Sequence, residues 1–315
     1  MIEKDFWFPS ADRRTKIHAV KWMPDTKEYD FILQIAHGMQ EYIGRYREFA
    51  EFLTDRRVLV VGHDHLGHGE SVASSLDYGF FAEKNAGRVL IQDMHRLRTS
   101  VQGKNKQVPY FMLGHSMGSY LLRRYLTLHS ECLCGAVIVG TGSMPDLVMK
   151  FGMGICRFLG MVKGWRYRSP LLKKMSFLGP YQKYDVTGRD VKRNWLTKDL
   201  AIAEKYYKDP GCCFDFTVNG YYGLMETVHY DNQPENIAKI KKTLPLFLVS
   251  GDKDPVGNMG KGVRYAFRQY KTAGLSDVSM KLYENDRHEL LNETDRIKVY
   301  GDIYHWMQKR LKCEI

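Results

Sequence analysis

Short apolar runs recur along the chain and predict buried strands. A central parallel strand is covered on both faces and therefore shows an unbroken apolar run rather than an alternation. Residues 16–22 instead alternate polar with apolar or bulky side chains, which predicts one further strand. The unbroken runs cover residues 30–36, 58–61, 110–113, 136–139 and 244–250, and a last strand is expected at residues 278–283.

Between these runs, apolar residues recur at helical spacing. Within residues 46–53, tyrosine, phenylalanine, alanine and leucine stand at i, i+3, i+4 and i+7, which predicts an amphipathic helix. Strands that alternate with helices are typical of α/β proteins. The predicted fold class is therefore α/β, with a doubly wound, mostly parallel sheet. Further helices are expected around residues 87–101, directly after residue 116, around residues 263–270 and from about 293 to 310.

The alternation stops between about residues 143 and 236. This stretch mixes glycine, methionine, aromatic and charged residues, and no run in it resembles a buried parallel strand. We interpret it as a helical insertion. The predicted domains are a core formed by residues 1–142 and 237–315, and a cap or lid formed by residues 143–236.

Composition narrows the class of protein. Hydrophobic residues make up 44% of the chain, which suffices for a large core, and no apolar stretch reaches the roughly 18 residues of a membrane span. The N-terminus lacks the features of a signal peptide, so we expect a soluble, cytoplasmic protein with reduced cysteines. The net charge is +11, but no nucleic-acid motif accompanies it, and we expect no nucleic-acid partner. The six cysteines are Cys132, Cys134, Cys156, Cys212, Cys213 and Cys313.

The most informative motif joins the predicted strand 110–113 to the helix that follows it. It reads Gly-x-Ser-x-Gly over residues 114–118, with Ser116 at its centre. A turn this tight leaves no room for flanking side chains, and it raises the serine hydroxyl above the carboxyl end of the sheet. Ser116 is therefore the predicted nucleophile.

A serine hydroxyl needs a base to take its proton and an acid to orient that base. Both should follow later strands of the sheet. His288 follows the strand 278–283, and Asp252 and Asp254 both follow the strand 244–250. Their positions alone do not separate the two aspartates.

Two backbone N–H groups are expected to stabilise the negative charge that develops on the substrate oxygen. Met117 supplies one, because it begins the helix after the nucleophile. Met39 supplies the other, in the loop after the strand 30–36, where Gly38 lets the backbone come close. No residue is assigned to a cofactor or a metal.

Together these motifs resemble the monoacylglycerol lipase and lysophospholipase branch of the α/β hydrolases, in its bacterial form. The resemblance covers nearly the whole core, and the order serine, aspartate, histidine is that of the α/β hydrolases. In this family the acid stands three residues after the glycine, which implies Asp254, and the oxyanion donors fall on Met39 and Met117. The motifs are His37 to Tyr46, Gly62 to Ser71, Gly114 to Gly118, Gly251 to Asp254, and His288.

The resemblance implies a cofactor-independent serine hydrolase. The expected substrate is a lipid-like ester with a single acyl chain, such as a monoacylglycerol or lysophospholipid, cleaved through an acyl-enzyme. Two alternatives use the same triad: a short-chain or aryl carboxylesterase, and an acyltransferase. A catalytically silent lipid-binding protein is a third alternative, although every catalytic position is filled. The sequence does not predict the oligomeric state.

Two polar clusters invite other interpretations. His63, His65 and His68 fit the spacing of a two-metal hydrolase, but residue 67 is glycine where that pattern requires a carboxylate. We therefore expect these histidines, with Asp64, to fix a loop beside the site. Glu41 and Arg45, four residues apart, are expected to form a structural ion pair.

The insertion also carries a basic segment. Between residues 147 and 184 there are eight basic residues and no acidic one, interleaved with methionine, leucine and aromatic residues. Such a segment is typical of a peripheral contact with an anionic membrane, although a solvated face explains it equally well. The basic residues are Lys150, Arg157, Lys163, Arg166, Arg168, Lys173, Lys174 and Lys183.

Overall fold

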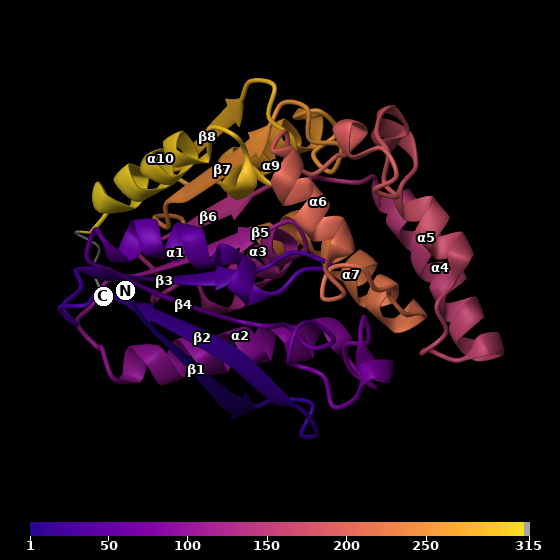
Figure 1. Ribbon diagram of the computed structural model, residues 1–315, viewed down its shortest axis with the longest axis horizontal. Helices are drawn as coiled ribbons and strands as arrows, with labels where there is room; N and C mark the ends of the chain where they lie inside the picture. Colours follow the sequence, from indigo (N-terminus) through magenta and orange to yellow (C-terminus); the bar gives the residue numbers. More distant parts are fainter. Residues whose placement is uncertain (312–315) are drawn as a thin grey trace.

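The computed structural model describes residues 1–311, whose centre is an eight-stranded sheet (Figure 1). The strand order is β1-β2-β4-β3-β5-β6-β7-β8. β2 pairs antiparallel with β1 and β4, and every other pairing is parallel. The predicted α/β class is confirmed. The strands are β1 (Ile2–Pro9), β2 (Lys16–Met23), β3 (Phe31–Ala36), β4 (Val58–His63), β5 (Tyr110–His115), β6 (Gly135–Val139), β7 (Leu246–Gly251) and β8 (Val278–Tyr283).

Helices cover both faces of the sheet and make two hydrophobic cores. On one face α1 (Arg47–Thr54) and α10 (Arg296–Gln308) pack against apolar side chains of the strands. On the other face lie α2 (Ala86–Gly103), α3 (Met117–His129) and α9 (Lys261–Thr272). The expected apolar face of residues 46–53 is buried.

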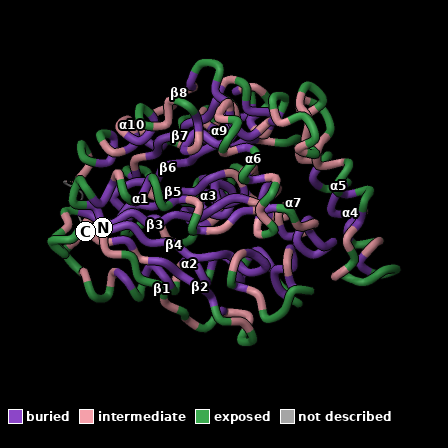
Figure 2. Tube along the Cα trace, viewed as in Figure 1, coloured by how far each residue is buried: buried purple, intermediate pink, exposed green. Residues whose placement is uncertain are grey.

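A long segment without strands separates β6 from β7. α4 packs on α7, which in turn contacts α2 and α3. In Figure 1, α4 and α5 lie at the opposite end of the molecule from the two termini, and Figure 2 shows that much of this end is exposed. The helices of the segment are α4 (Asp146–Lys163), α5 (Pro170–Ser176), α6 (Leu200–Lys208), α7 (Val218–Asp231) and α8 (Pro234–Ile237), with 3-10 turns at Gly179–Lys183 and Val191–Arg193. Other 3-10 turns are Ile43–Tyr46, Ser75–Asp77 and Leu290–Asn292.

The structure also tests two expectations from the sequence, the lack of a membrane span and the reduced state of the cysteines. None of the helices within residues 1–311 combines the length and apolar character needed to cross a bilayer. Cys134 is disulfide-bonded, so the prediction that all six cysteines are reduced is wrong. The spacing of the cysteines in the sequence matches no recognised disulfide pattern, so sequence reasoning missed this disulfide. Cys313 lies outside the described residues, and Cys132, Cys156, Cys212 and Cys213 are free thiols.

Candidate active site

Ser116 lies on a strained turn between β5 and α3. Its backbone has φ 53° and ψ −119°, a conformation that residues with a side chain rarely adopt. The two motif glycines make the turn possible. A Cβ at Gly114 would lie 2.3 Å from the carbonyl oxygen of Gly118, and one at Gly118 would lie 2.1 Å from that of Ala36. The turn therefore tolerates only glycine at both positions.

His288 and Asp254 form a buried pair at the carboxyl end of the sheet. The imidazole Nδ1 lies 3.0 Å from each carboxylate oxygen of Asp254. His288 is 2% exposed and Asp254 is fully buried. Asp254 also accepts hydrogen bonds from the Ser250 hydroxyl (3.0 Å) and the Val256 N–H (2.8 Å). A proton held on Nδ1 by this carboxylate leaves Nε2 of His288 as the acceptor.

Asp252 is placed differently. Its side chain is 30% exposed and accepts a hydrogen bond from the Asn285 N–H at 2.9 Å. It stabilises the loop and makes no hydrogen bond to His288 within the described part of the chain. Asp254 is the one of the two aspartates that contacts the imidazole.

The loop after β3 lies against Ser116. A Cβ built on Gly38 would lie 3.0 Å from the Ser116 Cβ. Nδ1 of His37 lies 2.7 Å from the Gly38 carbonyl oxygen, which orients the peptide between Gly38 and Met39. Within residues 1–311 the N–H groups of Met39 and Met117 have no protein acceptor, so both are available to a substrate oxygen.

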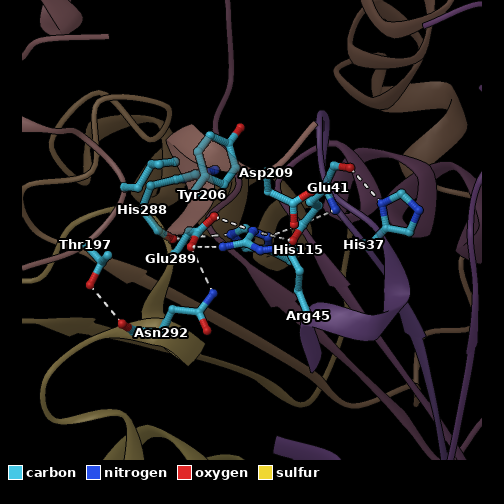
Figure 3. A network of polar contacts seen from close by, with 12 residues as sticks. His37, Glu41, Arg45, His115, Thr197, Tyr206, Asp209, His288, Glu289 and Asn292 are labelled. Carbon is cyan, nitrogen blue, oxygen red and sulfur yellow. Dashed lines mark hydrogen bonds and ion pairs between the residues drawn. The ribbon is translucent and has the colours of Figure 1, made fainter. Parts of the chain in front are cut away.

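A buried network of charged side chains connects these loops (Figure 3). Glu41 accepts hydrogen bonds from the Gly38 N–H and from Tyr46, and its carboxylate lies 2.9 Å from Nδ1 of His115. Arg45 contacts Glu41 at 3.0 Å and donates two hydrogen bonds, of 2.7 and 2.8 Å, to Glu289. The predicted Glu41–Arg45 pair is confirmed. Sequence reasoning missed the other members, since only the fold brings them together.

Comparison with known proteins agrees with this geometry. The family described as serine aminopeptidase, S33, matches residues 27–295, which is most of the chain. The chain belongs to this S33 family of α/β hydrolases. The α/β-hydrolase fold and the resemblance stated from the sequence are confirmed.

Several relatives of this S33 member carry lipase names. It is 25% identical to human monoglyceride lipase over 293 residues, covering 92% of this chain and 86% of that one. It is 24% identical to a monoacylglycerol lipase of Mycolicibacterium smegmatis, covering 92% of each. Among solved structures, a carboxyl esterase from Bacillus coagulans in complex with glycerol has a TM-score of 0.87 and 26% identity, covering 99% of both chains.

Burial and the contacts between Glu41, Arg45 and His115 determine the charges of these side chains. Burial alone would raise the pKa of Glu41, but the hydrogen bond with His115 and the charge of Arg45 outweigh it and hold that pKa well below its usual range. Burial alone would lower the pKa of His115, and the contact with Glu41 raises it instead. Glu41 is therefore a carboxylate, and its charge is balanced by Arg45.

The histidines at the end of β4 and in the loop that follows it lie next to the loop after β3, where His65 contacts His37. His63, His65 and His68 are fully buried, and burial lowers the pKa of His63 and of His68 to about 3. Asp64 fixes the loop, because its carboxylate accepts from the N–H of Ile43 and lies 2.8 Å from Nδ1 of His18. Within residues 1–311 no group of three or more metal-ligating side chains is assembled. Asp64 therefore makes the expected loop-fixing hydrogen bonds. The ring nitrogens of His63 and His65 have no hydrogen-bond partner among the described residues, so these two histidines contribute by ring packing instead.

Proposed function

We propose that this protein is a serine ester hydrolase that removes the acyl chain of a single-acyl, lipid-like ester, such as a monoacylglycerol or lysophospholipid. The observation that carries the proposal is the buried His288–Asp254 pair beside the strained turn of Ser116. The expected enzyme class, a carboxylic ester hydrolase, is confirmed by the family and by relatives named monoglyceride lipase. The substrate class remains part of the proposal.

In the proposed mechanism the oxygen of Ser116 attacks the ester carbonyl carbon while Nε2 of His288 takes the hydroxyl proton. Asp254 holds the imidazole and balances the positive charge it gains. The N–H groups of Met39 and Met117 stabilise the tetrahedral oxyanion. The leaving alkoxide takes the proton from His288 and departs, and a water activated by His288 then releases the fatty acid from Ser116.

We further propose that residues 143–236 form the cap over this site and that the remaining residues form the core. Two contacts support this division. The hydroxyl of Tyr184 donates to the Lys253 carbonyl at 2.7 Å, next to Asp254, and the ring of Trp195 lies against His288. A cap rich in methionine and aromatic side chains suits a flexible acyl chain.

A turnover panel tests the substrate class. It should compare monoacylglycerols, lysophospholipids, short aryl esters and an aminoacyl anilide, since the family is described as a peptidase. We expect the highest kcat/KM on a single-acyl glycerol ester or lysophospholipid and negligible cleavage of the anilide. Preferred cleavage of the anilide would contradict the proposal. Transfer of the acyl group to added glycerol, in place of fatty acid release, would identify an acyltransferase.

The surface of the proposed cap also supports a peripheral contact with an anionic membrane. In the structure, exposed apolar residues support this contact more than the basic residues do. Five of the eight predicted basic side chains have partners inside the molecule; for example, Arg166 contacts Asp77 and Lys173 contacts Asp215. The outward face of α4 is strongly apolar and would insert at the head-group boundary. The paired basic residues are Lys150, Arg157, Arg166, Arg168 and Lys173. The exposed residues of α4 include Leu147 (78%), Phe151 (65%), Phe158 (60%), Met161 (77%) and Val162 (60%).

A further inference from the structure

The indole of Trp195 lies against the imidazole of His288. The two ring centroids are 5.0 Å apart and the ring planes are inclined by 30°. Trp195 belongs to the segment between β6 and β7, far in sequence from β8 and the histidine that follows it. The contact therefore joins the proposed cap to the proposed catalytic base.

The backbone around Trp195 is anchored to the histidine loop on both sides. The N–H of His288 donates to the Trp195 carbonyl at 3.4 Å, and the N–H of Glu289 donates to the Leu196 carbonyl at 2.7 Å. The guanidinium of Arg287 donates to the carbonyls of Asn194 and Thr197. These hydrogen bonds hold the indole against the imidazole.

The segment is also stiff in its own right. Asn194 is fully buried, and its side-chain oxygen accepts from the N–H groups of Leu196 and Thr197 at 2.8 and 2.9 Å. Its amide nitrogen donates to the Val191 carbonyl at 2.7 Å. Tyr181 packs edge-on against the indole with a centroid distance of 5.3 Å. A loop tied down in this way positions Trp195 before substrate arrives.

We propose that Trp195 is a positioning residue for His288: its indole holds the imidazole in place, shields it from water and stabilises the imidazolium that forms when Ser116 is deprotonated. The face of an aromatic ring attracts a cation within about 6 Å of its centroid, and tryptophan is the strongest of the aromatic residues in this respect. The attraction exists only while the imidazole is charged, so it acts on the transition state more than on the ground state. This inference rests on the proposed role of His288.

Other groups around His288 would keep their contacts when Trp195 is changed. Asp254 binds Nδ1, and the ring of His115, with Glu41 on its own Nδ1, lies 4.8 Å from the imidazole by centroids. An effect on the protonation of His288 is therefore attributable to the indole. The remaining groups are Tyr181, whose pKa burial raises, and on the histidine's own loop Asp286, which pairs with Lys198, together with Arg287 and Glu289.

The test compares Trp195→Leu with Trp195→Phe on a soluble aryl ester. Leucine keeps an apolar cover without a π face, and we expect kcat to fall about 10-fold with KM nearly unchanged, while phenylalanine restores most of the loss. The acidic limb of the kcat/KM–pH profile should also move to lower pH in the leucine variant. Trp7→Leu is the matched control, because the Trp7 ring lies at a tilt against His18, a histidine outside the proposed triad, with the centroids 5.1 Å apart.

Equal kcat and an unshifted acidic limb in Trp195→Leu, equal losses in both variants, or a change confined to KM would each overturn the inference. A second readout does not depend on the stability of the leucine variant. The tryptophan fluorescence of wild type minus that of Trp195→Phe should titrate with the same midpoint as the acidic limb, and a flat difference would overturn the inference. His288→Ala separates the two proposals, since full activity in that variant would refute the proposed triad itself.

Discussion

At the residue scale, the site depends on which of two nearby carboxylates is buried. Asp254 is fully buried and contacts the imidazole with both oxygens, whereas Asp252 faces solvent and stabilises a turn. The sequence placed both at the end of the same strand and could not rank them without the family resemblance. Burial and the direction of the side chain decide, and neither is visible in a local pattern.

We expect Asp254→Asn to lower kcat by several orders of magnitude, because an amide neither holds the required tautomer of His288 nor balances its charge. Asp252→Asn is the matched control and should change kcat only slightly. Steady-state kinetics on a soluble aryl ester measures both. A larger loss for Asp252→Asn would move the acid to that residue.

The buried His63 should make the fold sensitive to acid. Burial lowers its pKa to about 3, so the folded protein keeps this ring neutral while the unfolded chain protonates it near pH 6.5. The contribution to stability is thus full above pH 6.5 and is lost as pH falls toward 3, by up to about 1.4 kcal/mol per pH unit. His63→Leu should therefore lose less stability than wild type between pH 7 and pH 4.

Thermal or urea unfolding at several pH values measures this difference. His305→Leu serves as the control, because His305 is exposed on α10 and its removal should leave the pH dependence unchanged. Parallel stability curves for wild type and His63→Leu would show that His63 is not the source of acid sensitivity.

At the element scale, the sequence predicted the elements whose burial leaves a local pattern. The unbroken runs became β3 to β7, the expected last strand became β8, and the apolar face of residues 46–53 became part of the core. β1 was missed because it is an edge strand that pairs only with β2 and exposes most of its charged side chains. The segment around Trp195 was predicted only as part of an insertion. Its place over His288 depends on hydrogen bonds from a loop about 90 residues later, such as those of Arg287.

The exposed apolar face of α4 is expected to bind membranes. Replacing Phe151, Phe158 and Met161 with serine removes exposed apolar side chains without entering the core, and should abolish sedimentation with phosphatidylglycerol vesicles. Replacing Lys163, Lys174 and Lys183 with glutamine should remove only the preference for anionic over neutral vesicles, since screened charges add little.

Both triple variants should turn over a soluble aryl ester at the wild-type rate, which controls for folding. If the wild-type protein sediments with neither kind of vesicle, the outward face of α4 is not a membrane contact. If the glutamine variant alone loses binding, charge rather than apolar burial provides the contact.

At the scale of the whole molecule, the parallel sheet assembles the site. Ser116, Asp254 and His288 follow β5, β7 and β8, strands that lie in one continuous row with β6 between the first two. Their carboxyl ends therefore meet at one edge, although the residues are up to 172 positions apart in the chain (288 minus 116). Such an arrangement needs the complete core. The proposed nucleophile, base and acid can therefore be tested together through one chemical event at Ser116.

That event is phosphonylation of Ser116 by an active-site-directed fluorophosphonate, in which the serine oxygen displaces fluoride from phosphorus; peptide mass spectrometry then locates the adduct. We expect a single adduct on Ser116, formed rapidly by wild type, at least a hundredfold more slowly by His288→Ala, and not at all by Ser116→Ala, with loss of ester hydrolysis in proportion to labelling. Both variants should keep the wild-type unfolding temperature to within a few degrees. An adduct on another residue, or ester hydrolysis that survives in Ser116→Ala, would show that Ser116 is not the nucleophile.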